Sequence, residues 1–180
     1  SGRAIENLIG GYDVQVRLRD MDTEGTDVHF IVQTAGAGHP DPFLEYEFVK
    51  AQHRYVNDFC NADPHRLKTC LNVTPRNVEA SVAEIKKWGR EPWCVAVLPS
   101  LPLDYPIDHP DLNPIWAAAA DEGLAVIHHS FSFGYPGYRD LWRNPFLGRT
   151  ASHPWGAMRA MGAFFGAGLL DRYPNLRFAV

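Results

Sequence analysis

Apolar positions along the chain alternate between two kinds of pattern. Short runs rich in β-branched and other apolar residues predict five strands, at residues 28–32, 67–73, 93–98, 124–129 and 176–180. Between these runs, apolar residues recur at spacings of three and four, which predicts helices over 44–61, 78–88, 111–122 and 154–169. The first of these helices carries Leu44, Phe48, Tyr55 and Phe59 at helical spacing. Asn77 is the expected N-cap of the second helix, and Gly89 its stop.

Strand alternating with helix predicts an α/β fold with a parallel sheet and right-handed crossovers. Two architectures fit this order, an open doubly wound sheet and part of a (β/α)8 barrel. No GxGxxG motif follows any predicted strand, so the dinucleotide-binding form of the open sheet lacks its main support. A full barrel needs about 250 residues, and the sequence has 180. We therefore expect residues 1–180 to form a single, incomplete barrel domain.

Composition and charge exclude several kinds of partner. The chain is 46% hydrophobic and 21% charged with a net charge of −4, and its cations form no run. Nucleic acids and anionic membranes bind clustered cations, so neither is an expected partner. There is no apolar stretch of membrane-spanning length. The three cysteines, Cys60, Cys70 and Cys94, form no CxxC pair, and we expect them to be reduced and buried in a cytoplasmic protein.

Candidate chemistry should lie where strands end, because the carboxyl ends of parallel strands form the functional face of both architectures. Only the fourth predicted strand ends in a metal-binding side chain, in the sequence His128-His129-Ser130. If Ile127 and His129 point into the barrel, Val126 and His128 face the helices. His129 could then bind a divalent metal. The alternative is a structural histidine, since the chain has no HxH or HExxH motif.

The long segment 131–152 is the second candidate feature. It is rich in aromatic residues and arginines, and long loops of this kind are usually functional. Arginine binds carboxylates with two hydrogen bonds, so this composition suits the binding of an aromatic, anionic substrate. We assign substrate binding to Ser130, Arg139, Trp142 and His153. The same composition suits a subunit interface in a homo-oligomer such as a dimer, and His153 could equally belong to a helix cap.

The remaining histidines receive no catalytic role. His29 is expected to pack inside the first strand, while the others are expected in loops or on the polar side of a helix (His39, His53, His65 and His109). Asp20, Asp22 and Glu24 precede the first strand and so belong to the opposite, stabilising end of the sheet. No nucleophile elbow or phosphate-binding loop is present.

Five segments, in order, resemble one known family. They are MDTEGTDV at 21–28, YVNDF at 55–59, DPHRL at 63–67, PIW at 114–116 followed by EGLAVIHH at 122–129, and GLLDRYPNL at 168–176. The set is similar to amidohydrolase-related enzymes, in particular the branch with aminocarboxymuconate-semialdehyde decarboxylase and the aromatic-acid decarboxylases. In that family the first segment opens the second barrel strand.

The resemblance implies a distorted (β/α)8 TIM barrel, of which this chain covers about strands 2 to 6. It implies one divalent metal ion, zinc or alternatively manganese, with His129 as the ligand that ends the fifth barrel strand. The family's HxH pair would precede Ser1, and its sixth-strand catalytic residue and eighth-strand Asp would follow Val180, so the catalytic residues are expected outside this segment.

The function implied is that of a metal-dependent hydrolase or decarboxylase. A metal-bound water would act on a small carboxylate substrate, aromatic or unsaturated. Two alternatives remain open, a non-catalytic barrel remnant that serves as a scaffold or subunit, and an open-sheet nucleotide binder.

Overall fold

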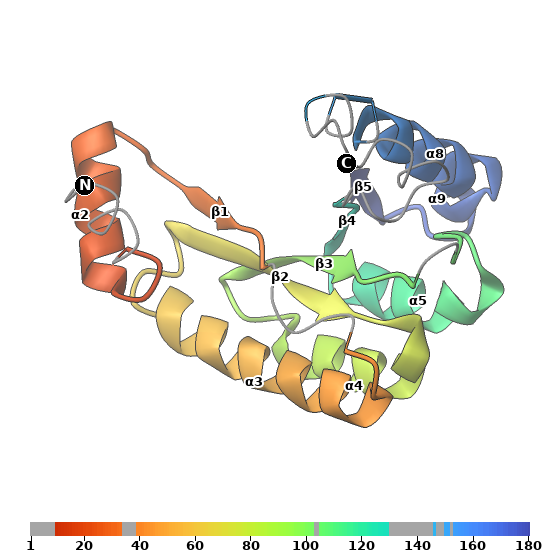
Figure 1. Cartoon of the computed structure of the whole chain (residues 1–180), viewed down its shortest axis with the longest axis horizontal. Coiled ribbons are helices and arrows are strands. Elements are labelled where there is room, and N and C mark those ends of the chain that lie inside the picture. The colour runs from red at the N-terminus through yellow and green to blue at the C-terminus, as the bar shows by residue number, and fades with distance from the viewer. Residues whose placement is uncertain (1–9, 34–38, 103–104, 130–145, 147–149, 152) are drawn as a thin grey trace.

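The chain folds around one sheet of five parallel strands in the order β1-β2-β3-β4-β5 (Figure 1). The computed structural model describes residues 10–33, 39–102, 105–129, 146, 150–151 and 153–180. The strands span His29–Ile31, Leu67–Val73, Cys94–Pro99, Ala125–Ile127 and Arg177–Ala179. All five predicted strands are therefore present, although β1, β4 and β5 are each only three residues long.

Helices connect the strands. Within the described residues they are α2 (Val14–Glu24), α3 (Pro42–Cys60), α4 (Val78–Trp88), α5 (Asn113–Asp121), α8 (His153–Gly166) and α9 (Leu169–Arg172), with short 3₁₀ turns at Pro75–Asn77 and Pro110–Leu112. Figure 1 shows α3, α4 and α5 along the same side of β2 and β3.

The strand order decides between the two predicted architectures. In a doubly wound sheet the order reverses at a switch point, and helices then cover both faces. Here every strand pairs with the next one along the chain and every pairing is parallel. Right-handed crossovers that always advance in one direction place their helices on one face. This is the arrangement of a (β/α)8 barrel wall.

The two faces of the sheet carry different apolar clusters. Leu71, Val97 and Val126 are in register on neighbouring strands and are fully buried in the main core with the helices. One position earlier on each strand, a second register row consists of Cys70, Ala96 and Ala125. This row belongs to a separate, smaller cluster, joined by Leu98, Val32 and Ile127. The alternation shows that the second cluster lines the face opposite the helices, which is the concave face of a barrel.

Local sequence accounts for several helix ends. Asp41 begins α3 by accepting hydrogen bonds from the N–H groups of Phe43 and Leu44, and Asn77 begins α4 by accepting one from Ala80. The predicted cap at Asn77 and stop at Gly89 are confirmed. These caps satisfy N–H groups that have no partner inside the helix.

Two of the described helices, α2 and the short α9, were not predicted. Helix α2 begins at Asp13, whose carboxylate accepts from two backbone N–H groups, and ends at Gly25, which has φ +69°. Residues 21–24 of the family-like segment therefore form the last turn of this helix, and residues 25–28 lead into β1, as the segment predicted. The helix is mostly polar and buries only Met21 fully, so its apolar pattern was weak.

Candidate functional site

The C-terminal end of β4 carries the predicted metal ligand. Strand β4 ends at Ile127, so His129 lies two residues beyond it rather than closing it as predicted. The backbone N–H of His128 still donates to the carbonyl of Ala179, at 2.8 Å, so the chain follows β5 for one more residue. His129 thus begins the connection that leaves the carboxyl end of the sheet.

His128 is half-buried. Burial lowers the pKa of its imidazole to about 4, with smaller contributions from the charges of His129 and of Arg159 on α8. Its Nδ1 atom is buried without a hydrogen-bond partner. The imidazole is therefore neutral at neutral pH, and its direction toward the helices stays a prediction.

His129 has the opposite environment. Ile127 packs in the concave cluster while Val126 is fully buried among the helices. The side chain of His129 is exposed, and the alternation of β4, if extended two residues beyond the strand, would direct it to the concave side. An exposed, unburied imidazole at the mouth of a barrel is a suitable metal donor.

The described residues do not supply a complete metal site. No group of three or more His, Cys, Asp or Glu side chains that could hold an ion occurs among them. Zinc sites use at least three protein ligands. A metal site that included His129 would need its other ligands from outside the described residues.

The other predicted site residues are not placed relative to His129. Ser130, Arg139 and Trp142 lie outside the described residues. His153 is the first residue of α8, and its side chain is outside the described part. Their assignment to substrate binding stays a prediction.

Sequence analysis missed a buried polar cluster beside the end of β2. His53 was expected on the polar side of its helix, but its side chain is fully buried. Its Nδ1 lies 2.7 Å from Oε2 of Glu84, and its Nε2 accepts a hydrogen bond from the backbone N–H of Asn72 at 3.1 Å. Trp88 donates to the same Glu84 oxygen at 3.0 Å. Because the N–H of Asn72 can only donate, Nδ1 must carry the imidazole proton.

A second missed residue, Arg76, holds the entrance to α3. Its guanidinium donates to the backbone carbonyls of His39 and Pro40 and to the carboxylate of Glu45, at 2.9 Å for the last. Glu45 is 2% exposed. Both Arg76 and the segment it holds follow the carboxyl ends of their strands, so this clamp shapes the mouth of the barrel.

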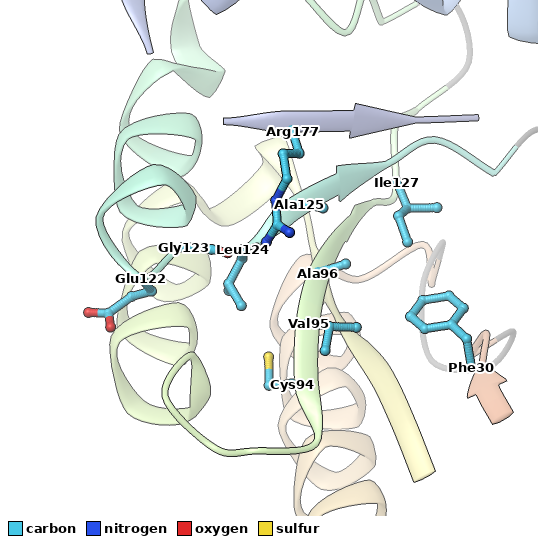
Figure 2. Close-up of a pocket in the computed structure, with 10 residues that line it drawn as sticks. All are labelled: Phe30, Cys94, Val95, Ala96, Glu122, Gly123, Leu124, Ala125, Ile127 and Arg177. Carbon is cyan, nitrogen blue, oxygen red and sulfur yellow. Dashed lines mark hydrogen bonds between the residues drawn. The ribbon is translucent and has the colours of Figure 1, made fainter. Parts of the chain in front are cut away.

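A hollow beside the sheet lies mostly toward the amino-terminal ends of the strands and extends to Ile127, the last residue of β4 (Figure 2). It reaches Cys94 at the start of β3, Gly123 before β4, and Arg177 at the start of β5. Most of its lining is apolar, and it contains none of the predicted site residues. In barrels the amino-terminal ends of the strands contribute to stability and the carboxyl ends to chemistry. We therefore do not place the active site in this hollow.

The family follows from comparison with known sequences. A family model described as amidohydrolase matches residues 17–180. The chain belongs to the amidohydrolase family. The resemblance noted from the five ordered segments is thereby confirmed. A comparison with curated proteins finds no match.

Solved structures share the amidohydrolase barrel with this chain. A 5-carboxyvanillate decarboxylase from Sphingomonas paucimobilis superposes with a TM-score of 0.72 at 20% identity, covering 90% of this chain and 49% of that one. A 2,6-dihydroxybenzoate decarboxylase from Rhizobium gives 0.71 at 20% identity, with 90% and 53% covered. A dihydroxybenzoic acid decarboxylase from Polaromonas sp. JS666, solved with bound manganese and the inhibitor 2-nitroresorcinol, gives 0.70 at 19% identity, with 90% and 52% covered.

These similarities establish the fold of the amidohydrolase chain. It spans about half the length of the structures it matches. The five parallel strands therefore correspond to part of a TIM barrel, as predicted. Within the described residues, no helix is long and apolar enough to span a bilayer.

Proposed function

We propose that this chain is part of a metal-dependent amidohydrolase-family enzyme, a hydrolase or decarboxylase that acts on a small aromatic or unsaturated carboxylate. The observation that carries the proposal is the position of His129. It follows β4 at the carboxyl end of a family-matched barrel wall and is exposed, and the alternation of β4 extended by two residues would direct it to the concave side. Three structural neighbours are aromatic-acid decarboxylases by name, which supports the substrate class.

In this proposal His129 contributes one ligand to a divalent metal, zinc or manganese. The bound metal would polarise a water molecule or a substrate oxygen. Manganese in one neighbour supports a divalent ion without selecting it here. Ser130, Arg139, Trp142 and His153 would hold the substrate, with arginine pairing with its carboxylate.

The remaining expectations belong to the same proposal. All three cysteines are free and buried, which supports a reducing, cytoplasmic setting. Burial raises the pKa of the Cys60 and Cys70 thiols to about 11 and of Cys94 to about 12, so they are poor nucleophiles at neutral pH. We therefore assign them no part in the reaction.

Metal analysis of the complete polypeptide tests the proposal. We expect about one divalent ion per chain, lost in His129→Ala and retained in His65→Ala, which removes an exposed histidine from the turn before β2. His128→Asn is a closer control, because it replaces the neighbouring imidazole. This variant should keep the bound metal. Retention of full metal by His129→Ala would overturn the ligand assignment.

The second candidate function is a non-catalytic barrel that serves as a scaffold or subunit. It is favoured by the absence of a three-ligand cluster among the described residues. A complete polypeptide that binds no divalent metal, and releases no carbon dioxide from a panel of hydroxylated benzoates, would support it.

A further inference from the structure

The sequence His-Pro-Asp occurs twice in the chain, at residues 39–41 and 109–111. Both copies lie in connections that leave the carboxyl end of a strand, the first after β1 and the second after β3. In each copy Nδ1 of the histidine accepts a hydrogen bond from the backbone N–H of the aspartate, at 3.1 Å from Asp41 and 3.3 Å from Asp111. Proline has no N–H, so the aspartate supplies the first backbone donor after the histidine. The two copies therefore form the same local turn, which we call the His-Pro-Asp turn.

The turn at 109–111 fixes the tautomer of its histidine. A backbone N–H can only donate, so Nδ1 of His109 is unprotonated and the neutral ring carries its proton on Nε2. The hydroxyl of Tyr105 lies 3.1 Å from the same Nδ1 atom, and the two ring centroids are 4.8 Å apart. Burial and then the charge of Asp111 raise the pKa of the Tyr105 hydroxyl, so it remains a donor. Nδ1 of His109 is thus the common acceptor for two groups.

The carboxylate of Asp111 lies beside this acceptor. Its Oδ2 is 3.5 Å from Nδ1 of His109 and 3.4 Å from the hydroxyl oxygen of Tyr105. The neutral imidazole has no proton on Nδ1, so it cannot donate to this carboxylate. Protonation of the ring reverses the situation, because Nδ1–H becomes a donor beside a negative charge and can no longer accept.

We propose that the His-Pro-Asp turn at 109–111 is a pH-sensitive switch in which protonation of His109 exchanges its partners. In the neutral state Nδ1 accepts from the Asp111 N–H and from the Tyr105 hydroxyl. After protonation Nδ1–H donates to the Asp111 carboxylate, and the Asp111 N–H loses its acceptor. Histidine is the side chain that responds to mild acid, so acidification is the signal that opens the turn.

The turn controls the entry to α5. The 3₁₀ turn Pro110–Leu112 is capped by the side chain of His109, and α5, which follows directly, has no side-chain cap of its own. Loss of the histidine cap therefore loosens the start of α5 and the connection that leads to it. This connection follows the carboxyl end of β3, the face on which barrels carry their chemistry. The switch thus changes the shape of that face in acid.

The charged neighbours of His109 are near it in the fold. Asp108 and Asp111 belong to the same connection, and α9 contributes Arg172, which donates to the side chain of Asn113 at 2.7 Å. In the part of the chain that the structure describes, the ion-pair partner of His109 is Asp111. Strand β3 is the middle strand of the sheet. Further strands of a barrel add at the sheet edges, so the elements on both sides of this connection belong to this chain.

The turn at 39–41 has additional support, which makes it the natural comparison. The guanidinium of Arg76 donates to the carbonyls of His39 and Pro40, and the Asp41 carboxylate is already engaged as the cap of α3. These bonds do not involve the imidazole. We therefore expect this turn to keep its shape in mild acid, whereas the turn at 109–111 opens.

Nuclear magnetic resonance of the complete polypeptide, isotope-labelled in its aspartate amides, tests the switch. The signal of Asp111 is identified by its loss in Asp111→Asn. Between about pH 8 and pH 5, exchange of this amide with water, corrected for the intrinsic effect of pH, should rise about fivefold, as loss of one ordinary hydrogen bond implies. In His109→Asn the rise should disappear, because the asparagine oxygen accepts from the same N–H at every pH. His39→Asn is the matched control and should keep the wild-type rise.

Three outcomes would overturn the proposal. They are a wild-type Asp111 amide whose corrected exchange does not depend on pH, a His109→Asn variant with the wild-type response, and a His39→Asn variant that loses it. Circular dichroism shows whether each variant is folded. The ring nitrogens of His109 give a further test in the wild type, since the neutral ring should carry its proton on Nε2, and a proton on Nδ1 would also overturn the switch. Neither metal content nor turnover enters these measurements.

Discussion

His53 on α3 and Glu84 on α4 form a buried pair, with 2.7 Å between Nδ1 and Oε2. The side chains of His53 and Glu84 are 0% and 7% exposed. The other ring nitrogen of His53, Nε2, accepts a hydrogen bond from the backbone N–H of Asn72 in β2. One neutral histidine therefore joins two helices to the strand that they cover.

Removing one partner of this pair should destabilise the fold strongly. Glu84→Ala leaves the Nδ1–H of His53 and the Nε1–H of Trp88 without acceptors, and we expect a loss of about 2–4 kcal/mol in the free energy of unfolding. Urea denaturation of the complete polypeptide measures it. Asp22→Asn, which weakens the exposed Arg66–Asp22 pair, should cost less than about 1 kcal/mol. Equal losses in the two variants would contradict the prediction.

The same pair predicts a pH dependence. Burial by itself would raise the pKa of Glu84, but the hydrogen bonds that its carboxylate accepts from His53 and Trp88 lower it below its ordinary value of 4.5. A carboxylate with a lowered pKa contributes stability that is present above its ordinary pKa and is lost as the pH falls below it.

Unfolding free energy measured against pH should therefore fall below about pH 4.5. In Glu84→Gln this part of the acid dependence should disappear, because the amide does not titrate. A variant with the same acid slope as wild type would show that other groups cause it.

Arg76 should contribute more to the free energy of unfolding than is usual for a partly exposed arginine. Arg76→Ala removes a guanidinium that pairs with the buried carboxylate of Glu45 and donates to two backbone carbonyls. We expect a loss of about 3 kcal/mol, the lower end for broken buried pairs, because the Arg76 side chain is 27% exposed. Arg90→Ala removes an ion pair of similar length, to Glu122, from a side chain that is 85% exposed. Thermal unfolding should detect the first change and not the second.

Gly123 should be intolerant of a side chain although there is space for one. Its φ is +69°, and an added Cβ would have no atom within 4 Å. The cost of Gly123→Ala is therefore conformational, about 1 kcal/mol. Gly162→Ala also meets no atom within 4 Å, but it lies inside α8 and should stabilise by about 0.5–1 kcal/mol. Chemical denaturation should show opposite signs for the two substitutions.

Metal removal gives a test of His129 that does not depend on activity. A ligand that binds only the native state stabilises it. Chelation should lower the melting temperature of the complete wild-type protein, and added zinc or manganese should restore it. His129→Ala should melt like the chelated protein and respond little to metal. A full metal response in that variant would remove His129 from the ligand set.

Local sequence predicted the elements whose signals lie within a few residues. Strand β2 was predicted with its observed bounds, because Leu67, Cys70, Leu71 and Val73 give an apolar-rich segment between the turn at Pro64 and the one at Pro75. The start of α4 was predicted because the Asn77 side chain caps it directly. Helix α2 was missed although Asp13 and Gly25 mark its ends, because its exposed, polar surface leaves little apolar periodicity.

The environment of individual side chains was harder to predict. Leu44, Phe48 and Tyr55 correctly indicated a helix, yet all three are exposed. His53 was expected on the polar side of its helix, but it is fully buried. Its partner Glu84 lies 31 residues away in the sequence, so no local pattern indicated the pair. Burial of a polar side chain depends on a partner that only the packed fold brings close.

The order of amino acids by itself determined the alternation of strands and helices and the family, because each depends on spacing along the chain. The tertiary structure alone decided the singly wound strand order, the buried His53–Glu84 pair, the Arg76 clamp and the exposed side of α3. These depend on contacts between residues distant in sequence, and no local pattern records which distant residue will supply the partner.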